Sequence, residues 1–279
     1  MRLATYRHQG RVWVGVVEGD TVRPAGQATT MLDVITGAGR FQAESLPLSQ
    51  VRLLAPIPRP PRNVLCVGKN YLDHAGEFDR SGFNRTGAGS LPEAPVVFTK
   101  PPESVIGPDA QILLPRDITS CLDYEAELAV VIGMKGRGIT PARALDHVFG
   151  YTIVNDVTAR DLQARHTQWF LGKALDTSCP MGPWIVTADE IDPTTLEIRC
   201  WVNDEPRQHA RTEELLFDIP TLVSTISAGT TLHPGDIIAT GTPAGVGAGF
   251  DPPRFLADGD TVRVEISGIG TLTNTVRVL

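Results

Sequence analysis

Short runs of alternating apolar and polar residues, separated by turn-forming residues, restrict this chain to a mainly β fold. Three such runs occupy residues 2–6, 12–17 and 21–23, and the turns between them read His-Gln-Gly and Glu-Gly-Asp. Alternation of this kind is typical of strands buried on one face. The 279 residues include 27 glycines and 22 prolines, and long runs with helical periodicity are scarce. We therefore expect an α+β protein that is mainly β with short helices.

A proline-dense segment divides the chain into two expected domains. Residues 55–62 read Ala-Pro-Ile-Pro-Arg-Pro-Pro-Arg, a sequence that resists both helix and sheet. We expect a small N-terminal β domain over residues 1–60 and a larger catalytic domain over residues 61–279. The strands expected in the larger domain are residues 63–67, 96–100, 125–132, 151–155, 184–187, 196–202, 236–240, 261–266 and 271–278.

Two helical segments and a long polar loop are also expected in the larger domain. Residues 70–78 carry a polar helical turn. Residues 158–169 are expected to form a helix that Thr158 caps, with Asp161 at the third helical position. Residues 79–94 are rich in Gly, Ser, Asn and Thr, and a loop of this length is often functional. This loop is either disordered or a mobile lid.

Composition and absent motifs exclude several classes of protein. The net charge is −7 and no run of Lys and Arg occurs, so we expect no nucleic-acid partner. No segment approaches the roughly 20 apolar residues of a membrane helix, and the N-terminus lacks the apolar core of a signal peptide. We therefore expect a soluble cytoplasmic protein without a membrane partner. The motifs G-x-S-x-G, H-E-x-x-H and G-x-x-x-x-G-K-[ST] are absent.

Two glutamates in an apolar strand are the most informative feature of the sequence. In the expected strand within residues 122–133, Glu125 and Glu127 share one face. Two carboxylates about 5 Å apart repel by about 3 kcal/mol at an effective dielectric constant of about 20. A shared proton, an arginine or a hard divalent ion such as Mg²⁺, Mn²⁺ or Ca²⁺ would offset this repulsion. Alternatively, this end of the strand protrudes and both carboxylates are solvated.

Asp156 is a candidate third carboxylate. It lies where the apolar run that ends at Asn155 gives way to an expected helix. A lone aspartate at such a point usually caps the helix. Together with the two glutamates, it would complete a three-carboxylate metal site.

His74 and Glu77 are candidates for an acid–base pair. Their i, i+3 spacing places both side chains on the same side of one helical turn, where they can hydrogen-bond. An imidazole oriented by a carboxylate is a suitable general base near neutral pH. The alternative is an exposed polar turn that precedes a loop.

Four further polar residues stand out in the second half of the chain. Lys173 lies between apolar neighbours and either donates to an anionic oxygen or is solvated. Arg160 and Gln163 are three residues apart on one expected helix and face the same side. The glycine-rich segment 241–249 either brings its N–H groups and the Thr242 hydroxyl to a ligand or is a plain turn.

These segments, in this order, resemble the fumarylacetoacetate hydrolase family over about residues 63–279. The matching pieces are Gly68-Lys-Asn-Tyr71 with His74 and Glu77, Val97-Phe-Thr-Lys100, Asp123-Tyr-Glu-Ala-Glu127, Asn155-Asp-Val-Thr-Ala-Arg-Asp-Leu-Gln163, Gly172-Lys173 with Asp176-Thr-Ser-Cys-Pro180, and Ala239-Thr-Gly-Thr-Pro-Ala-Gly-Val-Gly247. The resemblance implies a mixed β-sandwich-roll core and a homodimer.

The resemblance also implies a site and a chemistry. It implies a divalent ion, commonly Mg²⁺, on Glu125, Glu127 and Asp156, and a base formed by His74 with Glu77. It implies hydrolysis of a C–C bond in a 2,4-diketo acid of the acylpyruvate or fumarylpyruvate type, through an enolate that the ion stabilises. Decarboxylation of oxaloacetate-like acids and isomerisation of unsaturated 2-keto diacids in aromatic catabolism are alternatives. A protein that binds small acids without turning them over is a further alternative.

The remaining roles are implied by the same resemblance. Lys173 and Gln163 carry over as contacts to the reacting oxygens of a small keto acid, and Thr242 as a contact to the substrate carboxylate. Arg160 carries over as a further substrate-binding candidate. Mn²⁺ and Ca²⁺ remain alternatives to Mg²⁺.

Overall fold

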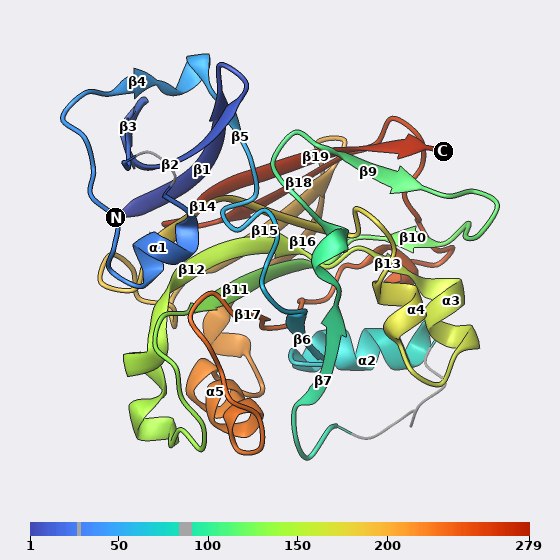
Figure 1. Ribbon diagram of the computed structural model, residues 1–279. Coiled ribbons are helices and arrows are strands. Elements are labelled where there is room, and N and C mark those ends of the chain that lie inside the picture. Colours follow the sequence, from blue (N-terminus) through green and yellow to red (C-terminus); the bar gives the residue numbers. More distant parts are fainter. Residues whose placement is uncertain (27–28, 84–90) are drawn as a thin grey trace.

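The computed structural model describes residues 1–26, 29–83 and 91–279 and is built mainly from strands, as expected (Figure 1). The largest sheet runs from the N-terminal segment through the centre of the molecule. Its main path is β4 (Leu46–Pro47), β3 (Thr21–Pro24), β2 (Arg11–Glu18), β1 (Arg2–His8), β14 (Cys179–Thr187), β12 (Val148–Asn155), β11 (Ala126–Ile132), β17 (Ile237–Ala239), β6 (Val64–Gly68) and β7 (Val96–Lys100). Off this path, β5 (Arg52–Leu53) pairs with β1 and β8 (Val105–Ile106) with β14.

A second sheet packs against the first. Its strand order is β16 (Glu205–Arg211), β15 (Glu197–Val202), β18 (Thr261–Ile266), β19 (Gly270–Val278) and β9 (Gln111–Leu114). Side chains of both sheets meet in one buried cluster, in which Leu128 and Val130 of β11 lie with Val264 and Leu272. Burial of large aliphatic side chains contributes about 1.5–3 kcal/mol each. The expected mixed sandwich architecture is therefore confirmed. A separate pair is formed by β10 (Leu122–Asp123) and β13 (Thr158–Ala159).

Strand β11 is buried on both faces, which positions the two glutamates. Leu128 and Val130 belong to the cluster between the sheets, while Ala129 and Val131 belong to a second cluster on the opposite face. Successive side chains of a strand alternate between faces. Glu127 therefore projects to the same side as Ala129, away from the second sheet, and it is 1% exposed.

The N-terminal segment forms the three short strands expected from its alternating runs, and these strands join the central sheet. Strand β1 pairs with β2 on one side and with β14 on the other, where Leu3 lies opposite Ile185. The short helix α1 (Met31–Ile35) follows its N-cap residue Thr30, which forms a capping box with Asp33. The division into domains of residues 1–60 and 61–279 stays a prediction.

The helices of the described residues are short, and none is long and apolar enough to span a membrane. They are α1, α2 (Leu72–Arg80), α3 (Arg160–Arg165), α4 (Phe170–Lys173) and α5 (Ile219–Ser227), with 3₁₀ turns η1 (Leu48–Gln50), η2 (Pro102–Ser104), η3 (Pro141–His147), η4 (Thr212–Glu214) and η5 (Gly247–Gly249). Helix α2 confirms the expected helical turn. Of the expected loop or lid at 79–94, residues 84–90 lie outside the described residues.

The expected helix over residues 158–169 is wrong in its start and its length. Thr158 pairs with Asp123 as part of β13, and its hydroxyl donates to the Asp156 carbonyl, so it caps no helix. Helix α3 starts only at Arg160 and ends at Arg165, and α4 follows as a separate turn. Pairing between distant segments has overridden the local capping signal.

Candidate metal centre and active site

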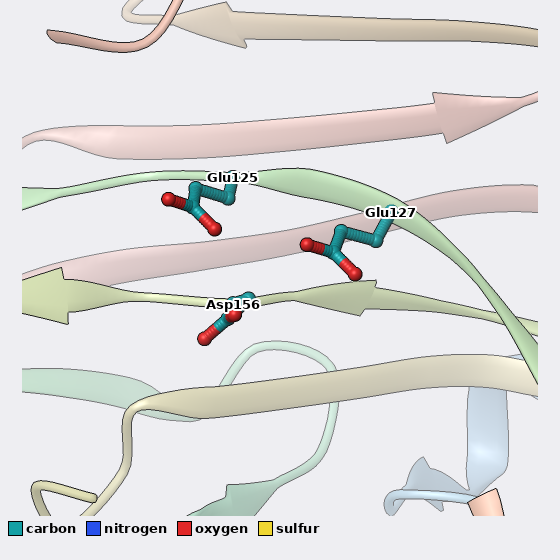
Figure 2. Close-up of side chains that lie close together, drawn as sticks. All are labelled: Glu125, Glu127 and Asp156. Carbon is teal, nitrogen blue, oxygen red and sulfur yellow. The ribbon is translucent and has the colours of Figure 1, made fainter. Parts of the chain in front are cut away.

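Three carboxylates meet where β11 and β12 lie side by side. The pairing of these strands places Ala126 opposite Asn155, and the Asp156 N–H donates to the Glu125 carbonyl at 2.9 Å. Oxygens of Glu125, Glu127 and Asp156 all lie within 4.8 Å of one another. Figure 2 shows the two glutamate side chains on the same side of their segment, with Asp156 on the neighbouring segment. All three are buried, so the solvated alternative for the glutamates is wrong.

Buried cations neutralise part of this negative charge. Lys173 Nζ lies 2.7 Å from Glu125 Oε2 and 2.8 Å from Asp156 Oδ2. Arg160 Nη1 lies 2.7 Å from Glu125 Oε1, and Lys100 Nζ lies 2.7 Å from Asp156 Oδ1. Burial alone would raise the pKa of Glu125, but Lys173 and Arg160 outweigh it and lower the pKa to about 2. Glu125 is therefore ionised.

Glu127 has less of this compensation, because Lys173 lowers its pKa only in part. Its Oε2 accepts a hydrogen bond from the Gly241 N–H at 2.9 Å, and among the described residues it forms no ion pair. Burial, followed by the charges of Asp156 and Glu125, raises the pKa of Glu127 well above its usual value. A cation between the three carboxylates would reverse this effect, because it favours the ionised form. Three clustered oxygen donors with an under-compensated carboxylate fit a hard divalent ion such as Mg²⁺, Mn²⁺ or Ca²⁺.

The candidate base is held by the glycine-rich segment. His74 Nδ1 lies 3.3 Å from Glu77 Oε2 on helix α2, and His74 is 5% exposed. The Gly245 N–H donates to Glu77 Oε1 at 2.9 Å. A Cβ at Gly249 would lie only 2.0 Å from the same oxygen, so glycine is required there for the carboxylate to fit. With Nδ1 donating to Glu77, a neutral His74 has Nε2 as its basic nitrogen.

One pocket brings most of the sequence-predicted residues together. Its empty volume is about 290 Å³, including space open to solvent. It is lined by Val67, Gly68, Lys69, His74, Phe98, Glu125, Glu127, Arg160, Gln163, Trp169, Lys173 and Thr242. Glu77 and Asp156 reach this group through their contacts with His74 and Lys173. All nine predicted site residues thus lie in one connected site, and their chemical roles stay predictions.

The side chains expected to contact substrate are fixed by neighbours. Arg160 Nη1 donates to Gln163 Oε1 at 3.1 Å, and both lie on α3, as expected from their spacing. The Thr242 hydroxyl accepts a hydrogen bond of 2.8 Å from Gln208 Nε2. Lys173 is 2% exposed, so the solvated alternative for this lysine is wrong.

Two residues that support the site carried no role in the sequence-based prediction. The Asp123 carboxylate accepts hydrogen bonds from the N–H groups of Gly247 and Ala248, at 2.7 and 3.0 Å, and from Arg160 Nε at 2.8 Å. It therefore joins the glycine-rich segment to Arg160. Lys100, which is fully buried, also donates to the carbonyl groups of Val157 and Lys173. Charged residues at the ends of apolar runs are the signal that could have identified both.

Comparison with known proteins identifies the family. Residues 63–277 match the family model described as fumarylacetoacetate (FAA) hydrolase C-terminal. Residues 1–56 match the model described as Rv2993c-like, N-terminal. The first match covers well over half of the chain, so the chain belongs to the fumarylacetoacetate hydrolase family of enzymes.

Individual relatives carry different chemistries. The chain is 52% identical over 230 residues to the oxaloacetate tautomerase YisK of Bacillus subtilis. The aligned residues make up 82% of this chain and 74% of that protein. The crystal structure of 2-hydroxyhepta-2,4-diene-1,7-dioate isomerase from Mycobacterium marinum matches with a TM-score of 0.83 at 41% identity, covering 100% of this chain and 98% of the other. Maleylpyruvate hydrolase from Sphingobium sp. SYK-6, solved with manganese(II) and pyruvate, matches with a TM-score of 0.79 at 33% identity, covering 100% and 99%.

Proposed function

We propose that this protein is a divalent-metal-dependent enzyme that catalyses the keto–enol tautomerisation of a short, oxaloacetate-like 2-keto acid. In this reaction a proton moves between the keto oxygen and the neighbouring carbon. One observation carries the proposal: two members of a buried three-carboxylate cluster, Glu125 and Glu127, line a pocket with His74, which Glu77 orients. The 52% identity to an oxaloacetate tautomerase supports this reaction.

Glu125, Glu127 and Asp156 would hold the ion, Mg²⁺ or Mn²⁺. When bound, the ion would supply Lewis-acid polarisation of the keto and carboxylate oxygens, which makes the neighbouring carbon more acidic. The under-compensated carboxylate of Glu127 and the all-oxygen donor set support this assignment. The similarity to maleylpyruvate hydrolase, which was solved with manganese(II), also supports a divalent ion at this site.

The side chains of the pocket would bind the acid and move the proton. His74 would take a proton from the carbon next to the keto group while the keto oxygen gains one, which gives the enol, and the reverse transfer would give the ketone; Glu77 would keep the imidazole in one orientation. A positioned base of this kind contributes about 10²–10⁴-fold to the rate. Lys173, Gln163 and Thr242 line the pocket around His74 and would donate to the substrate oxygens.

Hydrolysis of a 2,4-diketo acid of the acylpyruvate or fumarylpyruvate type is the second candidate function. The same His74–Glu77 pair could take a proton from water, and the similarity to maleylpyruvate hydrolase favours this alternative. The two reactions would share the metal and the base. They differ because hydrolysis breaks a C–C bond, whereas tautomerisation only moves a proton between carbon and oxygen. Arg160 would contact the substrate in either case, because it lines the same pocket. We retain a homodimer in the cytoplasm as a prediction.

The experiment that tests the proposal compares two substrates on one preparation. Decay of the enol form of oxaloacetate is followed by its absorbance with Mg²⁺ or Mn²⁺, then with EDTA, and acylpyruvate cleavage is followed by loss of diketo absorbance with pyruvate as product. EDTA-sensitive acceleration of enol decay without release of CO₂ is the expected result. EDTA-sensitive cleavage of acylpyruvate alone would favour the hydrolase, and release of CO₂ a decarboxylase. Metal binding without any turnover would indicate a protein that only binds small acids.

A further inference from the structure

Gln208 on β16 joins the strand that carries the two glutamates to the glycine-rich segment. Only 3% of this side chain's residue is exposed, and its amide forms three hydrogen bonds. Its Oε1 accepts from the Ala126 N–H at 3.0 Å. Its Nε2 donates to the Pro243 carbonyl at 2.7 Å and to the Thr242 hydroxyl at 2.8 Å. Ala126 lies between the two glutamates in the chain, so one side chain of the second sheet contacts both sides of the active site.

Two backbone partners fix the orientation of this amide. The Ala126 N–H can only donate, so it must meet the amide oxygen. The Pro243 carbonyl can only accept, so it must meet the amide nitrogen. A primary amide has two N–H hydrogens, and the second one is directed at the Thr242 hydroxyl. The hydroxyl oxygen is therefore the acceptor in its bond with Gln208.

The Thr242 hydroxyl consequently keeps its own hydrogen for another partner. Thr242 is 2% exposed and lines the active-site pocket, and among the described residues its hydroxyl donates to no group. A buried donor without an acceptor is costly, and an anionic oxygen is the acceptor that it binds most strongly. The pocket thus contains a hydroxyl donor whose direction is set by the protein.

Strand β16 also holds the backbone of the glycine-rich segment. Gly245 has a φ angle of +102°, and a Cβ there would collide with the carbonyl oxygen of Arg207, the neighbour of Gln208. The segment therefore packs directly on the backbone of β16. Because these contacts exist without a ligand, the Thr242 donor is in place before a ligand binds, which lowers the cost of binding.

We infer that Gln208 is a positioning residue that makes the Thr242 hydroxyl a donor to a carboxylate oxygen of the bound 2-keto acid. This inference rests on the proposed function, in which such an acid lies between the carboxylate cluster and Thr242. A donor of this kind holds the acid but does not move the proton at carbon. Its loss should therefore raise KM and the dissociation constant and change kcat much less.

The test is a double-mutant cycle of Gln208→Glu and Thr242→Val, read as the calorimetric affinity for pyruvate in the presence of Mn²⁺. Glutamate has the size of glutamine and still accepts from the Ala126 N–H. Its second oxygen cannot donate to both the Pro243 carbonyl and the Thr242 hydroxyl, so the hydroxyl, which can rotate, donates to it instead. The loss of affinity in Gln208→Glu should be at least about 10-fold larger with Thr242 present than in the Thr242→Val background. The added charge acts in both backgrounds, so this ratio isolates the hydroxyl.

Two further variants complete the test. Thr242→Ser keeps the hydroxyl, so Gln208→Glu should cause the larger loss in this background as well. Gln208→Met removes the amide without adding charge and should give a coupling with Thr242→Val of the same sign. Equal losses in both backgrounds would show a merely structural role and overturn the inference, as would a wild-type protein that does not bind pyruvate. A wild type that binds pyruvate but does not accelerate decay of the oxaloacetate enol would contradict the proposed function, while the cycle would still decide the role of Gln208.

Discussion

A single added methyl group at Gly249 should disable the proposed base without touching the proposed metal ligands. A Cβ at this position would lie 2.0 Å from Glu77 Oε1 and 2.2 Å from its Cδ, whereas ordinary contacts begin near 3.4 Å. In Gly249→Ala the carboxylate must therefore retreat by roughly 1 Å or more. That shift breaks its 2.9 Å bond to the Gly245 N–H and its 3.3 Å contact with His74. A misplacement of about 1 Å can cost about 10²-fold in rate.

The assay compares Gly249→Ala with Gly229→Ala. Gly229 is exposed, and a Cβ there meets nothing within 4 Å, so this control adds the same methyl group in open space. We expect kcat for oxaloacetate enol decay to fall about 100-fold in Gly249→Ala, with the affinity for Mn²⁺ unchanged. The control should behave as the wild type. Equal activity of the two variants would refute the role assigned to the His74–Glu77 pair.

Two further predictions concern stability. Asp123→Ala removes a fully buried partner of Arg160 and should lower the free energy of unfolding by about 3–5 kcal/mol in urea denaturation; a loss below about 1 kcal/mol would show that this contact is dispensable. Tyr6 is fully buried, its hydroxyl has no hydrogen-bond partner among the described residues, and burial raises its pKa from 10.0 to about 12. Because burial favours the neutral hydroxyl in the folded state, this contribution to the free energy of unfolding is present below pH 10 and is lost as the pH rises toward 12. Tyr6→Phe should therefore reduce the loss of stability at alkaline pH, measured by thermal unfolding at several pH values. Equal alkaline loss in both proteins would contradict this.

Local patterns predicted the parts of the site that depend on one element. Strand alternation placed Glu125 and Glu127 on one face, and the i, i+3 spacing placed His74 beside Glu77. Every strand expected in the larger domain is present within a few residues of its expected bounds. These features depend only on backbone period and side-chain direction, which the sequence contains directly.

Contacts between distant segments could not be read in this way. Asp123 reaches Arg160 and the glycine-rich segment, and Lys100 reaches Asp156, only because the sheets bring these segments together. The same limit explains the wrong helix start at Thr158, where pairing with Asp123 replaced the expected cap. The order of the motifs in the sequence indicated the family, while these supporting contacts came from the fold.

The most direct test of the central claim is a titration of metal-free protein with Mn²⁺, followed by electron paramagnetic resonance, in the wild type and in Glu127→Gln. The substitution keeps the size of the side chain and removes the carboxylate that forms no ion pair among the described residues. We predict one ion per wild-type chain and an affinity at least about 10-fold weaker in Glu127→Gln, since carboxylate oxygens are the ligands that such ions prefer. Equal affinity in the two proteins, or no binding to either, would contradict the assignment of Glu125, Glu127 and Asp156 as a metal centre.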